Sequence, residues 1–154
     1  MPTELPDAAG RIEIERACER LMYIYARALD LGDLSAAADC FAEDATMARP
    51  MAPDQVIEGR ESIRAALLTR PSTLLTKHLV SNVMIDVESA DRARGISCLT
   101  MISTTPPADT RPPFISKGPL YFGVFQDRFV REQGAWKFLE RRGSIQMKLE
   151  PGAS

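Results

Sequence analysis

The chain has 154 residues, of which 45% are hydrophobic and 26% charged, and its formal net charge is −2. This composition is typical of a globular domain and argues against collagen, coiled coils and intrinsic disorder. The near balance of charge predicts no nucleic-acid partner and no membrane association, and a single histidine excludes a zinc site built from several histidines.

The first part of the chain has the periodicity of helices. Apolar residues at three- and four-residue steps predict a helix over 11–31, and Gly32 is a stop signal for it. Asp33 can cap a second, short helix that ends at Cys40. A short strand is expected near 46–48.

A third helix is predicted after a loop. Two prolines predict a loop over 50–55, and a short edge strand is expected at 56–58. The helix over 60–70 then ends at Pro71, because proline cannot continue a helix from within.

From residue 74 the hydrophobic period changes to two, which predicts strands. In the first of them Leu79 and Val83 are expected on one face, and His78 and Asn82 on the other. Further strands are predicted at 93–104, 119–131 and 136–148, with a turn at 89–91, a Pro-rich loop at 105–113 and a tight hairpin at Gln133–Gly134. Helices first and strands last indicate an α+β fold, with helices against one face of an antiparallel sheet.

The length and the lack of an internal linker predict one domain over 1–154, with flexible ends at 1–8 and 149–154. Residues 1–44 carry a net charge of −6 and the remainder +4. An acidic helical layer over a basic sheet explains this asymmetry, and an anionic ligand in the second part is the alternative.

Three cysteines, Cys18, Cys40 and Cys98, lie in apolar segments at spacings that match no metal site. They predict reduced, buried thiols in a cytoplasmic protein, with no bound metal. The first residues lack a signal-peptide pattern, and no apolar run approaches the roughly 20 residues that span a bilayer.

Four local motifs occur in the order found in one known family. They are Tyr25 to Asp33 continuing to Phe41–Ala45, Gly59 to Ile63, Lys77 to Ile85, and Asp127 to Phe129 continuing through Gly134 to Arg141. With these residues the chain resembles the NTF2-like superfamily, called SnoaL-like in bacteria, over nearly its whole length. The resemblance implies a strongly curved, mostly antiparallel sheet that wraps around a deep pocket, with the first helix closing one side. It also implies a homodimer formed through the sheet.

The same resemblance selects three candidate catalytic residues. Scytalone dehydratase-like and bile-acid dehydratase-like members place a catalytic histidine at the position of His78 and an aspartate at that of Asp30. Tyr25 aligns with a tyrosine that binds a substrate oxygen in ketosteroid isomerases and the bile-acid dehydratase. A carboxylate can orient the imidazole of a general base, and a phenol can stabilise an enolate. On an ideal helix Asp30 and Tyr25 are about 140° apart, so both reach one pocket only if the helix ends or bends near Leu29.

The chain also departs from these relatives. Arg49 stands where ketosteroid isomerases carry their catalytic aspartate, which argues against that mechanism. Leu29 replaces the tyrosine that scytalone dehydratase has beside Asp30, and the second pocket histidine of that enzyme is absent. Further candidates for substrate binding are Asn82, Arg49, Met84, Met101, Phe125 and Trp136. Arg141 and Arg142 are adjacent on a strand and point to opposite faces, so one of them is expected to face the concave, pocket side of the sheet or an interface.

These residues predict a cofactor-independent lyase or isomerase of the dehydratase type. Its substrate is expected to be a hydrophobic, oxygenated molecule that is cyclic or polyketide-like. Two alternatives stay open at this point. One is a non-catalytic module that binds a small molecule or serves as an accessory subunit, and the other is a SnoaL-like polyketide cyclase.

Overall fold

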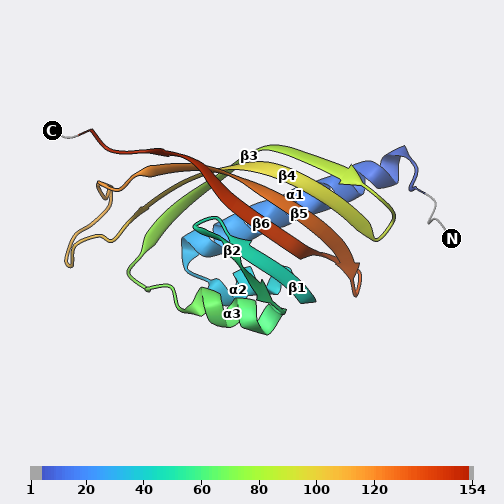
Figure 1. Ribbon diagram of the computed structural model, residues 1–154, viewed down its shortest axis with the longest axis horizontal. Helices are drawn as coiled ribbons and strands as arrows, with labels where there is room; N and C mark the ends of the chain where they lie inside the picture. The colour runs from blue at the N-terminus through green and yellow to red at the C-terminus, as the bar shows by residue number, and fades with distance from the viewer. Residues whose placement is uncertain (1–4, 153–154) are drawn as a thin grey trace.

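The computed structural model describes residues 5–152, and its backbone forms three helices and one six-stranded sheet (Figure 1). The elements are α1 (Ala8–Leu31), α2 (Leu34–Asp39), β1 (Phe41–Arg49), β2 (Ala52–Glu58), α3 (Arg60–Leu68), β3 (Leu75–Val87), β4 (Arg92–Thr104), β5 (Leu120–Glu132) and β6 (Ala135–Leu149). The predicted α+β class is therefore confirmed. Of the ends predicted to be flexible, 1–4 and 153–154 lie outside the described residues, whereas Ala8 is helical and Leu149 is in a strand.

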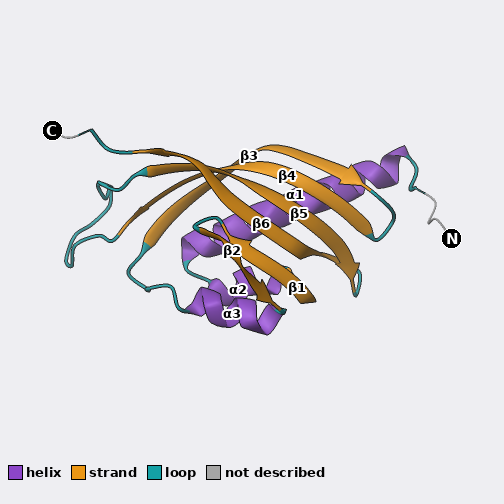
Figure 2. Ribbon diagram, in the orientation of Figure 1, coloured by secondary structure: helices purple, strands orange, loops and turns teal. Residues whose placement is uncertain are grey.

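The strand order in the sheet is β2-β1-β6-β5-β4-β3. Four of its pairings are antiparallel and the β1–β6 pairing is parallel, so the chain returns to lay its last strand beside its first. Figure 2 shows the long strands curving over α1, with α2 and α3 below the end of that helix. This arrangement leaves one face of the sheet covered by helix and the other open.

The long helix α1 forms where the sequence predicts it. The Asp7 side chain accepts a hydrogen bond from the backbone N–H of Gly10 and caps the first turn. Gly32 ends the helix at φ 74°, a left-handed conformation that costs glycine little. Between these caps the apolar stripe of α1 packs on an aromatic core, in which Phe41, Phe129 and Phe138 are almost fully buried.

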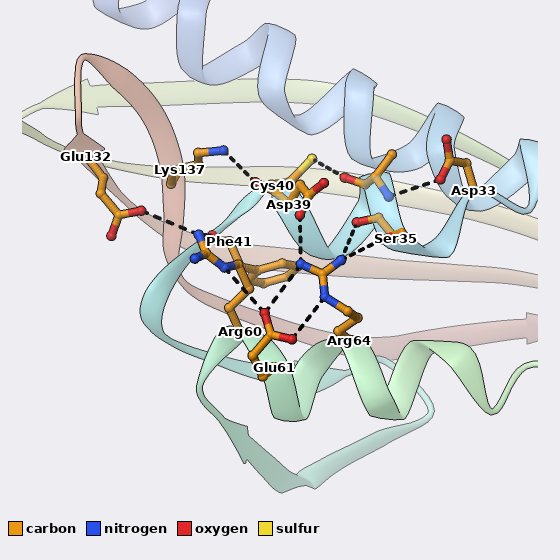
Figure 3. Close-up of polar contacts among 11 residues, drawn as sticks. Asp33, Ser35, Asp39, Cys40, Phe41, Arg60, Glu61, Arg64, Glu132 and Lys137 are labelled. Carbon is orange, nitrogen blue, oxygen red and sulfur yellow. Dashed lines mark hydrogen bonds and ion pairs between the residues drawn. The ribbon is translucent and has the colours of Figure 1, made fainter.

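A polar network joins the short helices to each other and to the sheet (Figure 3). The guanidinium of Arg64 on α3 bonds to Asp39 at 2.7 Å and to the Ser35 hydroxyl at 2.7 Å, both on α2. Arg60 forms an ion pair with Glu132 at 3.7 Å, beside the β5–β6 turn. These contacts fix α3, and hence the segment after it, against the body of the fold.

Two local predictions are wrong in detail. The segment 50–55 is only partly a loop, because β2 begins at Ala52 and contains Pro53. An edge strand tolerates proline, because the N–H groups on its outer side have no neighbouring strand to bond to, so the N–H that proline lacks is not missed. Cys18 and Cys40 are buried as expected, but Cys98 is only half-buried, and all three are free thiols.

The face assignments within β3 are also wrong. A bulge interrupts the pairing with β4 between Ser81 and Met84, where Asn82 has φ 50°. The extra residue reverses the alternation, so Val80 and Val83 both face the core with His78, whereas Leu79 and Asn82 are exposed.

Candidate active site

His78 and Asp30 form a close pair between β3 and the last turn of α1. The distance from Nδ1 of His78 to Oδ1 of Asp30 is 2.5 Å, and the side chains are only 10% and 14% exposed. The backbone N–H of His78 also donates to Oδ2 of Asp30 at 3.0 Å. One strand residue therefore holds both oxygens of the carboxylate and fixes its orientation.

The surroundings of Asp30 keep it ionised. Burial by itself raises the pKa of Asp30, but the hydrogen bonds from His78 and Thr76 outweigh burial, and the pKa is lowered below its ordinary value. An ionised carboxylate can only accept, so Nδ1 of His78 is assigned as the donor. In the neutral imidazole Nε2 then carries the free lone pair, which is the arrangement that a general base requires.

Two residues that sequence reasoning missed extend this pair. The Thr76 hydroxyl donates to Asp30 Oδ1 at 3.1 Å and accepts from the Arg70 guanidinium at 2.8 Å. Arg70 also donates to the backbone oxygens of Leu29 at 2.8 Å and Leu74 at 3.0 Å. Thr76 was detectable as the residue two positions before His78 on the same strand face. No sequence pattern identifies Arg70, because its partners come from tertiary packing.

A cavity of about 490 Å³ lies beside the histidine. Its wall is built by α1, the β1–β2 turn, α3 with the segment that follows it, and strands β3, β4 and β5. Most of the wall is apolar, from Leu29, Pro50, Met51, Ala52, Ala66, Leu67, Pro71, Leu74, Leu99, Met101 and Phe125. The remaining lining residues are Tyr25, Arg49, Thr69, Arg70, Thr76 and His78. A few polar groups in an apolar wall of this volume are typical of a small-molecule site.

Tyr25 and Asp30 lie on different sides of α1. The helix continues to Leu31 without a break, so the angular separation expected from the sequence persists. Tyr25 lines the large cavity, whereas Asp30 borders a separate surface depression, and His78 lines both. The imidazole thus stands between the cavity and the carboxylate, and Asp30 need not reach the cavity itself.

The Tyr25 phenol is held among aromatic rings. It contacts Phe41 and Phe138 edge-on, at centroid distances of 5.6 and 5.8 Å. Its hydroxyl has a weak donor contact to the Met47 sulfur at 3.7 Å. Burial raises the pKa of Tyr25 to about 12. The phenol is therefore protonated at neutral pH and can donate a hydrogen bond to a ligand.

Three of the six candidate substrate-binding residues line the cavity, namely Arg49, Met101 and Phe125. The other three do not. The bulge in β3 turns Asn82 to the surface and places Met84, which is 69% exposed, on the opposite face of the sheet. Trp136 lies beside the β5–β6 turn and packs against the hydrophobic core.

Of the two adjacent arginines, Arg141 faces the helices and Arg142 the other side. The Arg141 side chain is 1% exposed and stacks on the rings of Phe125, Phe138 and Tyr25 at 3.8, 4.4 and 4.8 Å. Its Nη1 is 3.6 Å from Oδ2 of Asp127, whose side chain has no exposed surface. Burial raises the pKa of Asp127 to about 6, and the charge of Arg141 limits the increase.

The described residues hold no cluster of three or more histidine, cysteine or acidic side chains that could bind a metal ion. Within residues 5–152, no helix has the length and hydrophobicity needed to cross a membrane.

Comparison with known proteins places these features in a family. A model of the SnoaL-like domain matches residues 10–142. A scytalone dehydratase-like protein from Novosphingobium aromaticivorans DSM 12444 superposes with a TM-score of 0.77 at 25% identity, over 95% of this chain and 93% of its own. The hexachlorocyclohexane dehydrochlorinase LinA, type 2, has a TM-score of 0.76 at 16% identity, over 95% and 94% of the two chains, and shares the fold. No curated protein sequence is significantly similar.

Proposed function

This chain belongs to the SnoaL-like domain family, within the NTF2-like superfamily, and we propose that it is a cofactor-independent lyase of the dehydratase type. The observation that carries the proposal is the His78–Asp30 pair at the wall of an apolar cavity. Relatives of this fold named for elimination chemistry, a scytalone dehydratase-like protein and a dehydrochlorinase, support the same reaction class.

The proposed reaction removes water next to a carbonyl group. Nε2 of His78 takes a proton from the carbon beside the carbonyl, and Asp30 stabilises the imidazolium that forms. Tyr25 donates a hydrogen bond to the carbonyl oxygen as it gains negative charge. The C–O bond to the departing hydroxyl then breaks, the imidazolium returns its proton to that oxygen, and the products are an alkene and water.

The cavity wall favours a hydrophobic, ring-bearing substrate. Leu99, Met101 and Phe125 form a broad apolar surface on the sheet side, and Leu67 and Leu74 supply the opposite side. A volume of about 490 Å³ accommodates a molecule of two or three fused rings.

A direct assay of this proposal uses 3-hydroxy-1-tetralone, a two-ring β-hydroxy ketone. Loss of water from it gives 1-naphthol, whose fluorescence reports the reaction. The wild-type protein is expected to accelerate naphthol formation above the buffer rate, and a cavity-filling Met101→Trp variant is expected to abolish the acceleration. Binding of the ketone without any acceleration, for this compound and for larger ring homologues, would instead favour the non-catalytic binding module.

We also propose that the open face of the sheet forms a homodimer. This face exposes four large apolar side chains, Leu79, Met84, Ile96 and Met147, at 59, 69, 42 and 64%. Apolar side chains gathered on one sheet face are typical of an association surface.

The dimer is tested by light scattering after size-exclusion chromatography. The wild type is expected at about twice the 17.0 kDa chain mass, and Leu79→Glu/Met84→Glu at the mass of one chain, because carboxylates resist burial. Leu68→Glu, an exposed apolar position on α3, is the matched control and should leave the dimer intact. A wild type that elutes as a monomer at micromolar concentration would contradict the proposal.

A further inference from the structure

The cavity wall carries more positive than negative charge. Among the 17 described residues that line it, two are arginines, Arg49 and Arg70, and none is aspartate or glutamate. Asp30, the nearest acid to the histidine, borders the separate depression behind it. The two guanidinium groups differ in their hydrogen bonds to the protein.

Arg70 is held in place by hydrogen bonds within the fold. Its guanidinium makes three hydrogen bonds, to the oxygens of Leu29 and Leu74 and to the Thr76 hydroxyl. Thr76 in turn donates to Asp30, so the charge of Arg70 is linked through one hydroxyl to a carboxylate. Arg70 thus serves to position the Asp30–His78 pair.

Arg49 has no such partner within residues 5–152. It lies at the end of β1, where the pairing with β2 shifts register between Ala48 and Arg49, and it makes no hydrogen bond or ion pair with a described side chain. A register shift of this kind re-aims a side chain. Arg49 is exposed to solvent and lies at the cavity wall, next to Pro50 and Met51. Burial raises the pKa of Tyr25, and the charge of Arg49 is the smallest of the effects that act on it, in the lowering direction.

We infer that the ligand of this cavity carries a carboxylate at one end, which Arg49 binds at the rim while the hydrophobic body fills the apolar wall. The inference rests on the proposed function only in taking this cavity as the substrate site. The guanidinium fork matches a carboxylate with two parallel hydrogen bonds, which a neutral amide cannot accept in the same way. Since the wall offers no acid of its own, a carboxylate here meets no like charge from it.

The test compares two probes of the same shape, 2-naphthoate, which is anionic at pH 7.5, and the neutral 2-naphthamide. Isothermal titration calorimetry on the wild type is expected to give naphthoate a Kd about tenfold lower than naphthamide. Arg49→Gln is expected to raise the Kd of naphthoate about tenfold and to change that of naphthamide less than twofold. Arg49→Lys, which keeps the charge but not the fork, should fall between the two.

Two controls separate this inference from other effects. Arg142→Gln removes an exposed arginine from the opposite face and should leave the tenfold preference intact. Met101→Trp fills the cavity and should weaken both probes, which shows where they bind. Equal wild-type affinity for the two probes, or the same loss in Arg142→Gln as in Arg49→Gln, overturns the inference.

The expected preference for naphthoate over naphthamide does not depend on catalysis. His78→Gln should keep the preference for naphthoate whether or not the wild type eliminates water. A preference without turnover would therefore reject only the lyase, and turnover without a preference would reject only the carboxylate ligand.

Discussion

Replacing His78 by glutamine is expected to lower kcat for the elimination by about 10³-fold, within the range that a positioned general base contributes. Glutamine can keep a hydrogen bond to Asp30, but it cannot take a proton from the substrate. The Kd of a bound ketone should change little, because the cavity keeps its apolar wall. Initial rates of 1-naphthol formation, with binding measured separately, test this expectation.

Variants of two other residues complete this test. Lys77→Gln is the control, because it alters an exposed side chain next to His78 on the same strand and should leave kcat unchanged. Asp30→Asn should lower kcat by at least about 10²-fold, since an amide can favour the wrong imidazole tautomer and cannot stabilise the imidazolium. If His78→Gln retains the full wild-type rate while Met101→Trp abolishes it, the cavity is the site but His78 is not its base.

Replacing Arg141 by methionine is expected to lower the free energy of unfolding by about 3–5 kcal/mol at pH 7, because it leaves the Asp127 carboxylate buried without a countercharge. Both oxygens of that carboxylate lack a hydrogen-bond partner among the described residues, so nothing else there compensates it. Urea denaturation followed by circular dichroism measures the loss. The double variant Asp127→Asn/Arg141→Met should recover most of it, since no buried charge then remains without a countercharge.

The same carboxylate predicts a pH dependence of stability. Burial raises the pKa of Asp127 from 3.8 to about 6, so between these values the native protein keeps a proton that the unfolded chain has lost. The stabilisation from this proton is fully present below about pH 4 and is lost as the pH rises to about 6, by about 3 kcal/mol in all. Asp30 has the opposite effect on stability. Its pKa is lowered in the folded protein, so the stabilisation from its ionised carboxylate is present above about pH 4 and is lost as the pH falls below that value.

Unfolding free energies at pH 4, 5, 6 and 7 test this dependence. The difference between wild type and Asp127→Asn should change by about 3 kcal/mol in favour of the variant across this range, because the amide does not titrate. A difference that stays constant from pH 4 to 7 would show that Asp127 ionises in the folded protein as readily as in the unfolded chain.

Local signals in the sequence were sufficient for most of the fold. The apolar stripe that ends at Gly32 predicted α1 to within three residues, because a helix buries one face and stops at a left-handed glycine. The change of period after residue 74 predicted the long strands β3 to β6, since their residues alternate between core and exterior. The predicted strand at 56–58 is shorter than β2, which begins at Ala52. Pro53 indicates a loop unless the strand is known to lie at the edge of the sheet.

For the candidate site, the sequence by itself determined which residue types were present: one histidine, an aspartate at the end of the first helix, and a tyrosine on its buried stripe. Only the tertiary structure decided how they meet. It set His78 between Asp30 and the cavity, and it linked Thr76, on the same strand face as His78, to Arg70, whose partners come only from tertiary packing. A bulge at Asn82 removed two predicted lining residues, and sheet pairing turned Arg141 rather than Arg142 inward. The physical reason is that periodicity predicts which residues share a face only as far as the next bulge, whereas register and packing decide where the bulges lie and which face is the inner one.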